Sequence, residues 1–362
     1  MVETLDEILR KALQYKGSDV FVVPGSQIMT KASGKMIPIS EERALPNDIS
    51  ILVDRAYELA GRTRETLHEE GDDDFSFAVR DLSRFRCNTY RQRGSLAMTC
   101  RVVAFGSPNP EDCHIPDVVM RLADLRSGMI LVTGPAGNGK STTLACLVDK
   151  INQTRSGHII TIEDPIEYEF RDGKSFVEQR EVGLDCPSFY SALTHAMRQA
   201  PDVIMVGEMR DKESFEAALQ AADTGHMVIS TVHAADASQV VGRILDLYPI
   251  QEQDTILEAL SANLKATVAQ RLLPKALGKG VVPVVEVMIC DPVVQRYISK
   301  KEFEKLPEAM ESAREAGMQT FNMAILDRIN NGEITEEVGL AASSSPTALK
   351  MNLKGIFLNS SK

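Results

Sequence analysis

The spacing of hydrophobic residues changes several times before residue 106, from helical to strand-like and back. It predicts an amphipathic helix over residues 3–14 and two short strands within 18–39. A longer helix is expected over 48–71, followed by further strands over 72–105. We therefore expect a mixed α+β domain over residues 1–106.

A different pattern begins after residues 107–117, where prolines and polar residues predict a linker. Beyond it, from residue 118 to 362, short apolar runs alternate with helical periodicity up to about residue 255, and the remainder is expected to be mostly helical. The alternation predicts an α/β domain with a parallel, doubly wound sheet. The expected strands are 129–133, 158–162, 202–206 and 227–232, and the expected helices are 140–151, 188–198 and 212–222.

The composition is that of a soluble globular protein, with 43% hydrophobic and 25% charged residues among 362. The formal net charge of −11 argues against stable nucleic-acid binding, which needs a basic surface. We find neither an apolar run long enough for a membrane helix nor an export signal. The six cysteines are not arranged in a CxxC pair, so we expect reduced thiols in a cytoplasmic protein.

The clearest chemical motif is GxxxxGKS, which begins at Gly134 and lies between an apolar strand and a helix. Its glycines allow backbone N–H groups to face phosphates at a helix N-terminus. Lys140 is expected to reach the β- and γ-phosphates of ATP, and Ser141 to bind Mg²⁺. The other predicted nucleotide-binding residues of the loop are Pro135, Ala136, Gly137, Asn138, Gly139 and Thr142.

Acidic residues and histidines flank three later predicted strands. In a doubly wound sheet the carboxyl ends of the strands line the ligand crevice, so several of these side chains should meet the phosphates. Many nucleotide-hydrolysing folds place a magnesium-binding aspartate where this chain has Gly207. The residues are Glu163 and Asp164 after the second strand, Glu208 after the third, and His226 and His233 on either side of the fourth.

Four segments together resemble the secretion ATPases, the hexameric motors of type IV pilus and type II secretion machines. They are the phosphate loop 134–142, an Asp box at 160–168, an atypical Walker B segment at 200–211 and a His box at 221–233. The resemblance is strongest to the type IV pilus retraction (PilT-like) ATPases and extends over most of the chain. It implies a PAS-like domain followed by a RecA-like ATPase domain.

The resemblance also implies roles for individual residues. Glu208 would be the catalytic base or a magnesium partner. Arg86 and Arg101 of the N-terminal sheet would close onto the nucleotide, where guanidinium groups neutralise charge on the γ-phosphoryl group. The remaining expectations are Glu163 and His233 as catalytic residues, His226 as a nucleotide-binding residue, and Ser141, Asp164 and Glu163 as ligands of Mg²⁺ bound with ATP.

The family further implies a homo-hexamer that hydrolyses ATP while docked, through an inner-membrane pilus platform protein, at the inner face of the cell membrane. The sequence departs from the family at Ala136 and Asn138, where Thr and Ser are commoner, and at 293–300, where the charge pattern of a retraction-linked element is lost. Three alternatives stay open: a pilus assembly, type II secretion or DNA-uptake ATPase, a nucleotide-binding regulator without turnover, and a nucleic-acid translocase.

Overall fold

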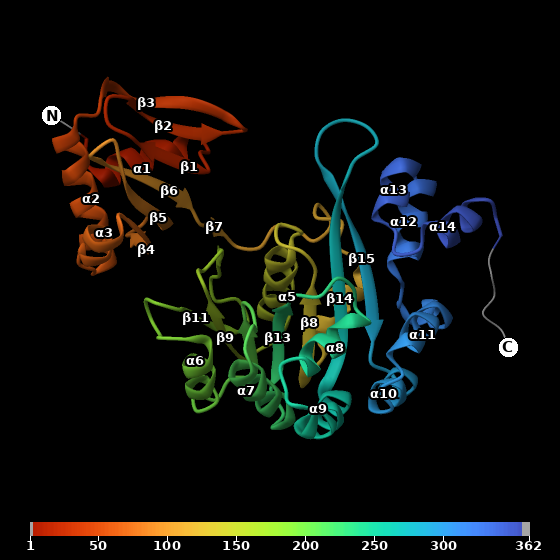
Figure 1. Ribbon diagram of the computed structural model, residues 1–362. Coiled ribbons are helices and arrows are strands. Elements are labelled where there is room, and N and C mark those ends of the chain that lie inside the picture. Colours follow the sequence, from red (N-terminus) through yellow and green to blue (C-terminus); the bar gives the residue numbers. More distant parts are fainter. Residues whose placement is uncertain (1–2, 357–362) are drawn as a thin grey trace. The chain divides into compact units, whose positions relative to one another are not determined.

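The computed structural model describes residues 3–356 and divides them into two compact units (Figure 1). The first unit ends at Phe105 and also includes Pro165–Glu169. The second starts at Gly106 and contains the rest of the described chain, so the expected linker 107–117 belongs to it. Among residues 3–356, the helices are all too short or too polar to span a bilayer.

The N-terminal unit is built on a six-stranded antiparallel sheet in the order β3-β2-β1-β6-β5-β4. Its helices pack on this sheet and share one apolar core with it. A short parallel pair, β7 with β10, completes the unit. The elements are α1 (Leu5–Gln14), β1 (Asp19–Val22), β2 (Gln27–Ala32), β3 (Lys35–Arg43), α2 (Pro46–Ala60), α3 (Glu65–Glu70), β4 (Asp72–Val79), β5 (Ser83–Gln92), β6 (Ser95–Val102), β7 (Ala104–Phe105) and β10 (Tyr168–Glu169).

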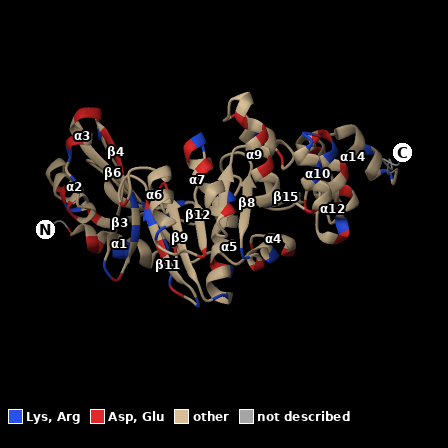
Figure 2. Cartoon of the chain, turned by 90° about the horizontal axis from the view of Figure 1, so that it is seen from below, with Lys and Arg blue, Asp and Glu red and all other residues tan. Residues whose placement is uncertain are grey.

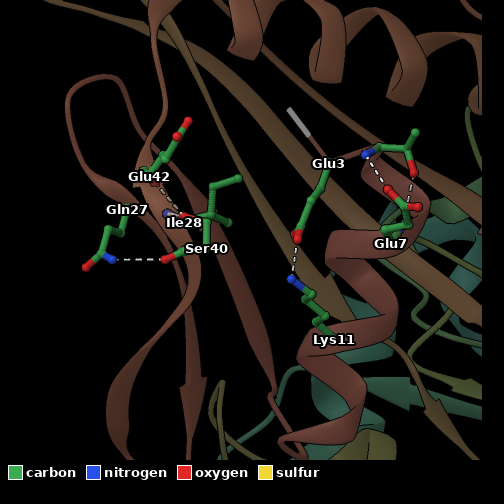
Figure 3. Close-up of polar contacts among 8 residues, drawn as sticks. Glu3, Glu7, Lys11, Gln27, Ile28, Ser40 and Glu42 are labelled. Carbon is green, nitrogen blue, oxygen red and sulfur yellow. Dashed lines mark hydrogen bonds and ion pairs between the residues drawn. The ribbon is translucent and has the colours of Figure 1, made fainter. Parts of the chain in front are cut away.

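The first helix, α1, begins with a capping box. The hydroxyl of Thr4 accepts from the backbone N–H of Glu7, and the carboxylate of Glu7 accepts from the N–H of Thr4 (Figure 3). Lys11, one turn further on, pairs with Glu3 in the same view. This end of α1 is therefore held by side chains as well as by the packing of its apolar face.

One expected helix, 48–71, is two helices in the structure. Gly61 ends α2 in the left-handed conformation, with φ 63°, and α3 starts four residues later. A glycine at this position adopts positive φ without the steric penalty that other residues carry, which makes it a common helix stop. Acidic residues are then concentrated on α3 and the start of β4 (Figure 2).

The second unit contains a seven-stranded sheet in the order β11-β9-β12-β13-β8-β14-β15. All neighbouring strands are parallel except β14 and β15. Its first elements are α4 (Asp117–Arg121), η1 (Leu122–Asp124), β8 (Gly128–Thr133), α5 (Lys140–Thr154), β9 (His158–Glu163), β11 (Phe176–Glu181), α6 (Phe189–Ala196), β12 (Val203–Val206), α7 (Lys212–Asp223), β13 (Met227–Val232), α8 (Gln239–Leu245) and α9 (Ile250–Asn263).

Alternate residues of the central strands enter two separate apolar cores, one on each face of the sheet. On β8, for example, Met129 and Leu131 join the core that contains α6 to α9, whereas Ile130 and Val132 join the core that contains α4 and α5. This is the side-chain alternation of a strand covered on both faces. The expected doubly wound α/β sheet is confirmed.

The last third of the chain is mostly helical, as expected, but it also contains two strands that the sequence pattern did not predict. The strands β14 and β15 form a long antiparallel hairpin that extends the sheet beside β8. Arg271 of β14 donates to the carbonyl of Ala342 and lies 4.1 Å from the ring centroid of Phe321. The elements are β14 (Leu264–Pro274), β15 (Val281–Ile289), α10 (Pro292–Ser299), η2 (Phe303–Lys305), α11 (Leu306–Ser312), η3 (Arg314–Ala316), α12 (Phe321–Asn330), α13 (Glu336–Ala342) and α14 (Pro346–Leu353).

Candidate nucleotide site

The phosphate loop lies in the expected context, between the fully buried strand β8 and the helix α5. Gly134 leaves the strand with φ 141°, and Gly139, with φ 79°, precedes the first residue of α5. Both angles are in the region that favours glycine. The middle of the loop, Pro135 to Gly137, is exposed, and Ser141 in the first turn of α5 is exposed as well.

The ammonium group of Lys140 folds back onto the loop. Its Nζ donates to the carbonyl oxygens of Gly134, at 2.9 Å, and Pro135, at 3.0 Å. Partial burial lowers the pKa of this ammonium group below its usual value, and the negative charge of Glu208 partly offsets the shift. A phosphate could replace the two carbonyl oxygens as the hydrogen-bond partner of Lys140.

Four parallel strands bring their carboxyl ends to the edge of the sheet where the phosphate loop begins. On β13, Val232 is level with Thr133 of β8, and on β12, Val206 is level with both Ser230 and Ile162. The residues that follow these strands are therefore neighbours at one edge. Glu163, Glu208 and His233 are all brought to it.

Glu208 is held in a fixed turn at the end of β12. The N–H of Gly207 donates to the carbonyl of Ile162 at 2.8 Å, and the hydroxyl of Thr231 donates to the carbonyl of Gly207 at 2.7 Å. A Cβ on Gly207 would be 3.4 Å from the carbonyl oxygen of Ile162, which is an ordinary van der Waals contact. The position that often carries an acid thus lies against the end of β9, and the acid of this chain is the next residue, Glu208.

The carboxylate of Glu208 has two positively charged or chargeable neighbours. Its Oε1 lies 2.8 Å from Nε of Arg210, and its Oε2 lies 3.6 Å from Nε2 of His233. Glu208 is mostly buried, whereas Arg210 and His233 are exposed. A carboxylate held in this way, with one side open to solvent, has the geometry of a group that can accept a proton from a bound water.

Glu163 and Asp164 differ in environment although they are adjacent. Glu163 is buried at the end of β9, where Oε1 accepts from Thr161 at 2.7 Å and from Gln179 of β11 at 3.1 Å. Asp164 is exposed. Within residues 3–356, His, Cys, Asp and Glu side chains do not form any group of three that could hold a metal ion by themselves.

The structure does not bring His226 to this edge. It precedes β13, and its backbone carbonyl accepts from Gly128 at the start of β8, so the full length of the strand separates it from the phosphate loop. Six residues of strand span about 20 Å. Its ring Nδ1 is 2.9 Å from the carbonyl of Ala221 at the end of α7, which is a structural contact.

Arg86 and Arg101 belong to the N-terminal unit, on β5 and β6, and both side chains are exposed. They are available to a ligand that reaches the surface of that sheet. Across the described chain, acidic and basic residues are interspersed along the elements (Figure 2).

Three residues that support the site could not be recognised from the sequence pattern. Thr133 exchanges two hydrogen bonds with Ala234, at 2.9 Å and 2.8 Å, and so ties the end of β8 to the residue after His233. Thr231 fixes the turn at Gly207, and Gln270 of β14 receives a hydrogen bond from α5. Each is a buried polar side chain inside an apolar strand, and its partner is distant in the chain.

A phosphate loop between a buried parallel strand and a helix, with an acid at the end of a neighbouring strand, defines a P-loop ATPase with a RecA-like core. A domain built on a six-stranded antiparallel sheet precedes this core in the chain. The chain belongs to the type II/IV secretion system protein family, whose sequence model matches residues 115–340.

Known relatives are similar to this chain over nearly its whole length. The type IV pilus ATPase PilU of Pseudomonas aeruginosa is 36% identical over 96% of this chain and 91% of its own. The type IV pilus retraction ATPase PilT of the same organism is 34% identical over 92% of this chain and 96% of its own. A crystal structure of the pilus retraction motor PilT with bound ADP superposes with a TM-score of 0.87, at 39% identity, and covers 96% of this chain and 99% of that one.

Proposed function

We propose that this protein is an ATP-driven motor that retracts a type IV pilus, working as a ring of six copies on a membrane platform protein. The observation that carries the proposal is the pairing of an intact phosphate loop with Glu208 at the end of β12. End-to-end similarity to pilus ATPases supports the task that the motor performs.

In this proposal the backbone N–H groups of residues 134–142 hold the phosphates of ATP, and Lys140 exchanges its two carbonyl partners for phosphate oxygens. The exposure of the middle of the loop supports this role, because a ligand can reach it. His226 is left out of the proposed nucleotide site, since a whole strand separates it from the loop.

Ser141, Asp164 and Glu163 are the proposed protein contacts of Mg²⁺. Mg²⁺ is usually bound by one or two carboxylates together with substrate phosphates and waters, and these residues offer one hydroxyl and two carboxylates. When bound, the ion neutralises charge on the β- and γ-phosphates. Glu163 already accepts hydrogen bonds from Thr161 and Gln179, which hold its carboxylate in a fixed position.

The proposed chemical step uses Glu208 as a base. A water attacks the γ-phosphorus, its proton passes to the Glu208 carboxylate, and the bond between the γ-phosphorus and the bridging oxygen breaks to leave ADP and phosphate. His233 and Arg210 hold the carboxylate in place. Arg86 and Arg101 are proposed to reach the phosphates when an N-terminal unit closes, which couples hydrolysis to domain movement.

The first test is ATP hydrolysis by the purified chain, measured together with its mass in solution. We expect turnover by a hexamer, loss of turnover but retention of ATP binding in Glu208→Gln, and loss of binding in Lys140→Ala. Equal hydrolysis rates for the wild type and Glu208→Gln would overturn the catalytic assignment. A chain that binds ATP without hydrolysing it in any assembly state would indicate a nucleotide-binding regulator.

The direction of the motor is tested by counting pili on cells that lack the gene. Retraction predicts an excess of surface pili, restored to normal by the wild-type chain and not by Glu208→Gln. Cells without pili would contradict retraction and indicate an assembly motor.

A further inference from the structure

We propose that Gln270 is a positioning residue for the phosphate loop and that it keeps the loop in the shape that binds nucleotide. Nothing in the sequence motif points to this residue, which lies more than 120 positions after the loop. The inference rests on the proposed ATPase function of the same site.

The side-chain amide of Gln270 has a fixed orientation. The hydroxyl of Thr143, in the first turn of α5, donates to Oε1 of Gln270 at 2.7 Å, and both residues are buried. Because the amide oxygen accepts from Thr143, the Nε2 group of Gln270 points away from Thr143. It faces Gly139 at the end of the phosphate loop.

Both terminal glycines of the loop lie directly against Gln270. A Cβ placed on Gly139 would be 2.9 Å from Nε2 of Gln270, and a Cβ on Gly134 would be 2.3 Å from its backbone oxygen. Cβ atoms do not approach other heavy atoms this closely. The two glycines of the motif therefore permit close packing of β14 as well as the backbone angles of the loop.

A third contact joins the same strand to the middle of the loop. Oδ1 of Asn138 accepts from the backbone N–H of Leu272 at 2.7 Å, while its Nδ2 lies 3.2 Å from the carbonyl of Ala136. Asn138 thus connects the loop to β14 through a side chain. The loop is supported at its start, middle and end by two residues of one strand, Gln270 and Leu272.

The support matters because nucleotide affinity depends on where the loop N–H groups point. In catalysis, a misplacement of about 1 Å caused by a distant mutation can cost on the order of a hundredfold in rate. Gln270 itself need not touch the nucleotide, since its effect passes through Gly139, Thr143 and the start of α5.

The test uses two measurements on the full-length chain. Calorimetry gives the affinity for ADP, and thermal unfolding without nucleotide gives the stability. Gln270→Met should weaken ADP binding by at least about tenfold. It also leaves the Thr143 hydroxyl buried without a partner, so it should lower the unfolding temperature. The double variant Thr143→Val/Gln270→Met removes both polar groups, and its unfolding temperature should recover while its ADP affinity stays low.

Thr267→Val is the matched control, because Thr267 is a buried residue of the same strand whose hydroxyl has no hydrogen-bond partner among residues 3–356. It should leave ADP affinity unchanged. Recovery of ADP affinity together with stability in the double variant would overturn the proposal, as would wild-type affinity in Gln270→Met. Failure of the wild-type chain itself to bind ADP would instead overturn the proposed function.

Discussion

Arg86 on β5 and Arg101 on β6 lie directly opposite each other, so two guanidinium side chains occupy one cross-strand pair. Like charges in this arrangement destabilise a sheet. Arg101 is partly compensated, since its Nε lies 2.8 Å from the carboxylate of Asp19. For Arg86 the structure of residues 3–356 gives no ion pair or side-chain hydrogen bond. Such a pair is readily explained if an anion is its partner during function.

The first prediction separates stability from activity at this pair. Arg86→Gln removes the repulsion, so the free energy of unfolding should stay the same or rise by a few tenths of a kcal/mol. Turnover of ATP should fall by about a hundredfold or more, because an arginine that meets the γ-phosphoryl group contributes strongly to the rate. Thermal unfolding and a steady-state ATPase assay measure the two effects.

Arg80→Gln is a suitable control, since Arg80 is an exposed arginine of the same unit, paired with its neighbour Asp81. It should change neither quantity. A normal turnover rate in Arg86→Gln and in Arg101→Gln would remove both arginines from the proposed mechanism.

The two histidines of the His box should behave differently. His233 lies 3.6 Å from the Glu208 carboxylate, so His233→Ala should lower turnover by about a hundredfold, the usual size of an acid–base or base-orienting contribution. His226 lies at the far edge of the sheet, and His226→Ala should hydrolyse ATP at close to the wild-type rate. A larger loss of turnover in His226→Ala than in His233→Ala would contradict this assignment of the two histidines.

Two glycines of the phosphate loop should differ in the stability of the nucleotide-free protein. A Cβ at Gly134 meets the backbone of Gln270, whereas a Cβ at Gly137 meets nothing within 4 Å. Gly137→Ala should therefore cost only the left-handed backbone strain of about 1–2 kcal/mol. Gly134→Ala should lower the free energy of unfolding by more, because the backbone has to move. Denaturant titration without nucleotide compares them.

Glu286 of β15 predicts a pH dependence of stability. Its carboxylate is buried and accepts from the backbone N–H groups of Ala237, at 2.7 Å, and Phe321, at 2.9 Å. Burial raises the pKa of Glu286 to about 7, although the two hydrogen bonds act in the opposite direction. The folded state therefore holds a proton that the unfolded chain releases near pH 4.5.

The raised pKa of Glu286 therefore contributes to the free energy of unfolding. This contribution is complete below pH 4.5 and is lost as the pH rises through about 7. The loss would be on the order of 3 kcal/mol for a shift of this size. The free energy of unfolding is measured by denaturant titration at pH 5, 6, 7 and 8. In Glu286→Gln, its decrease with rising pH should lack the part that Glu286 causes. An identical slope in both proteins would show that other groups cause it.

The sequence was sufficient for the phosphate loop and the strands beside it, because those strands are mostly apolar and end in recognisable residues. It was misleading for β14 and β15, where Gln270, Arg271 and Glu286 interrupt the apolar pattern. Gln270 and Glu286 are buried, and their partners, Thr143 and Phe321, come from distant parts of the chain. A local pattern carries no information about such partners.

The alternation of side chains along β14 places Gln270 and Arg271 on opposite faces of one strand. Gln270 supports the phosphate loop, and Arg271 reaches the last residue of α13. A shift of this strand along its own axis would therefore move both contacts together. The position of α13 and the shape of the phosphate loop are thus linked through neighbouring residues of one strand.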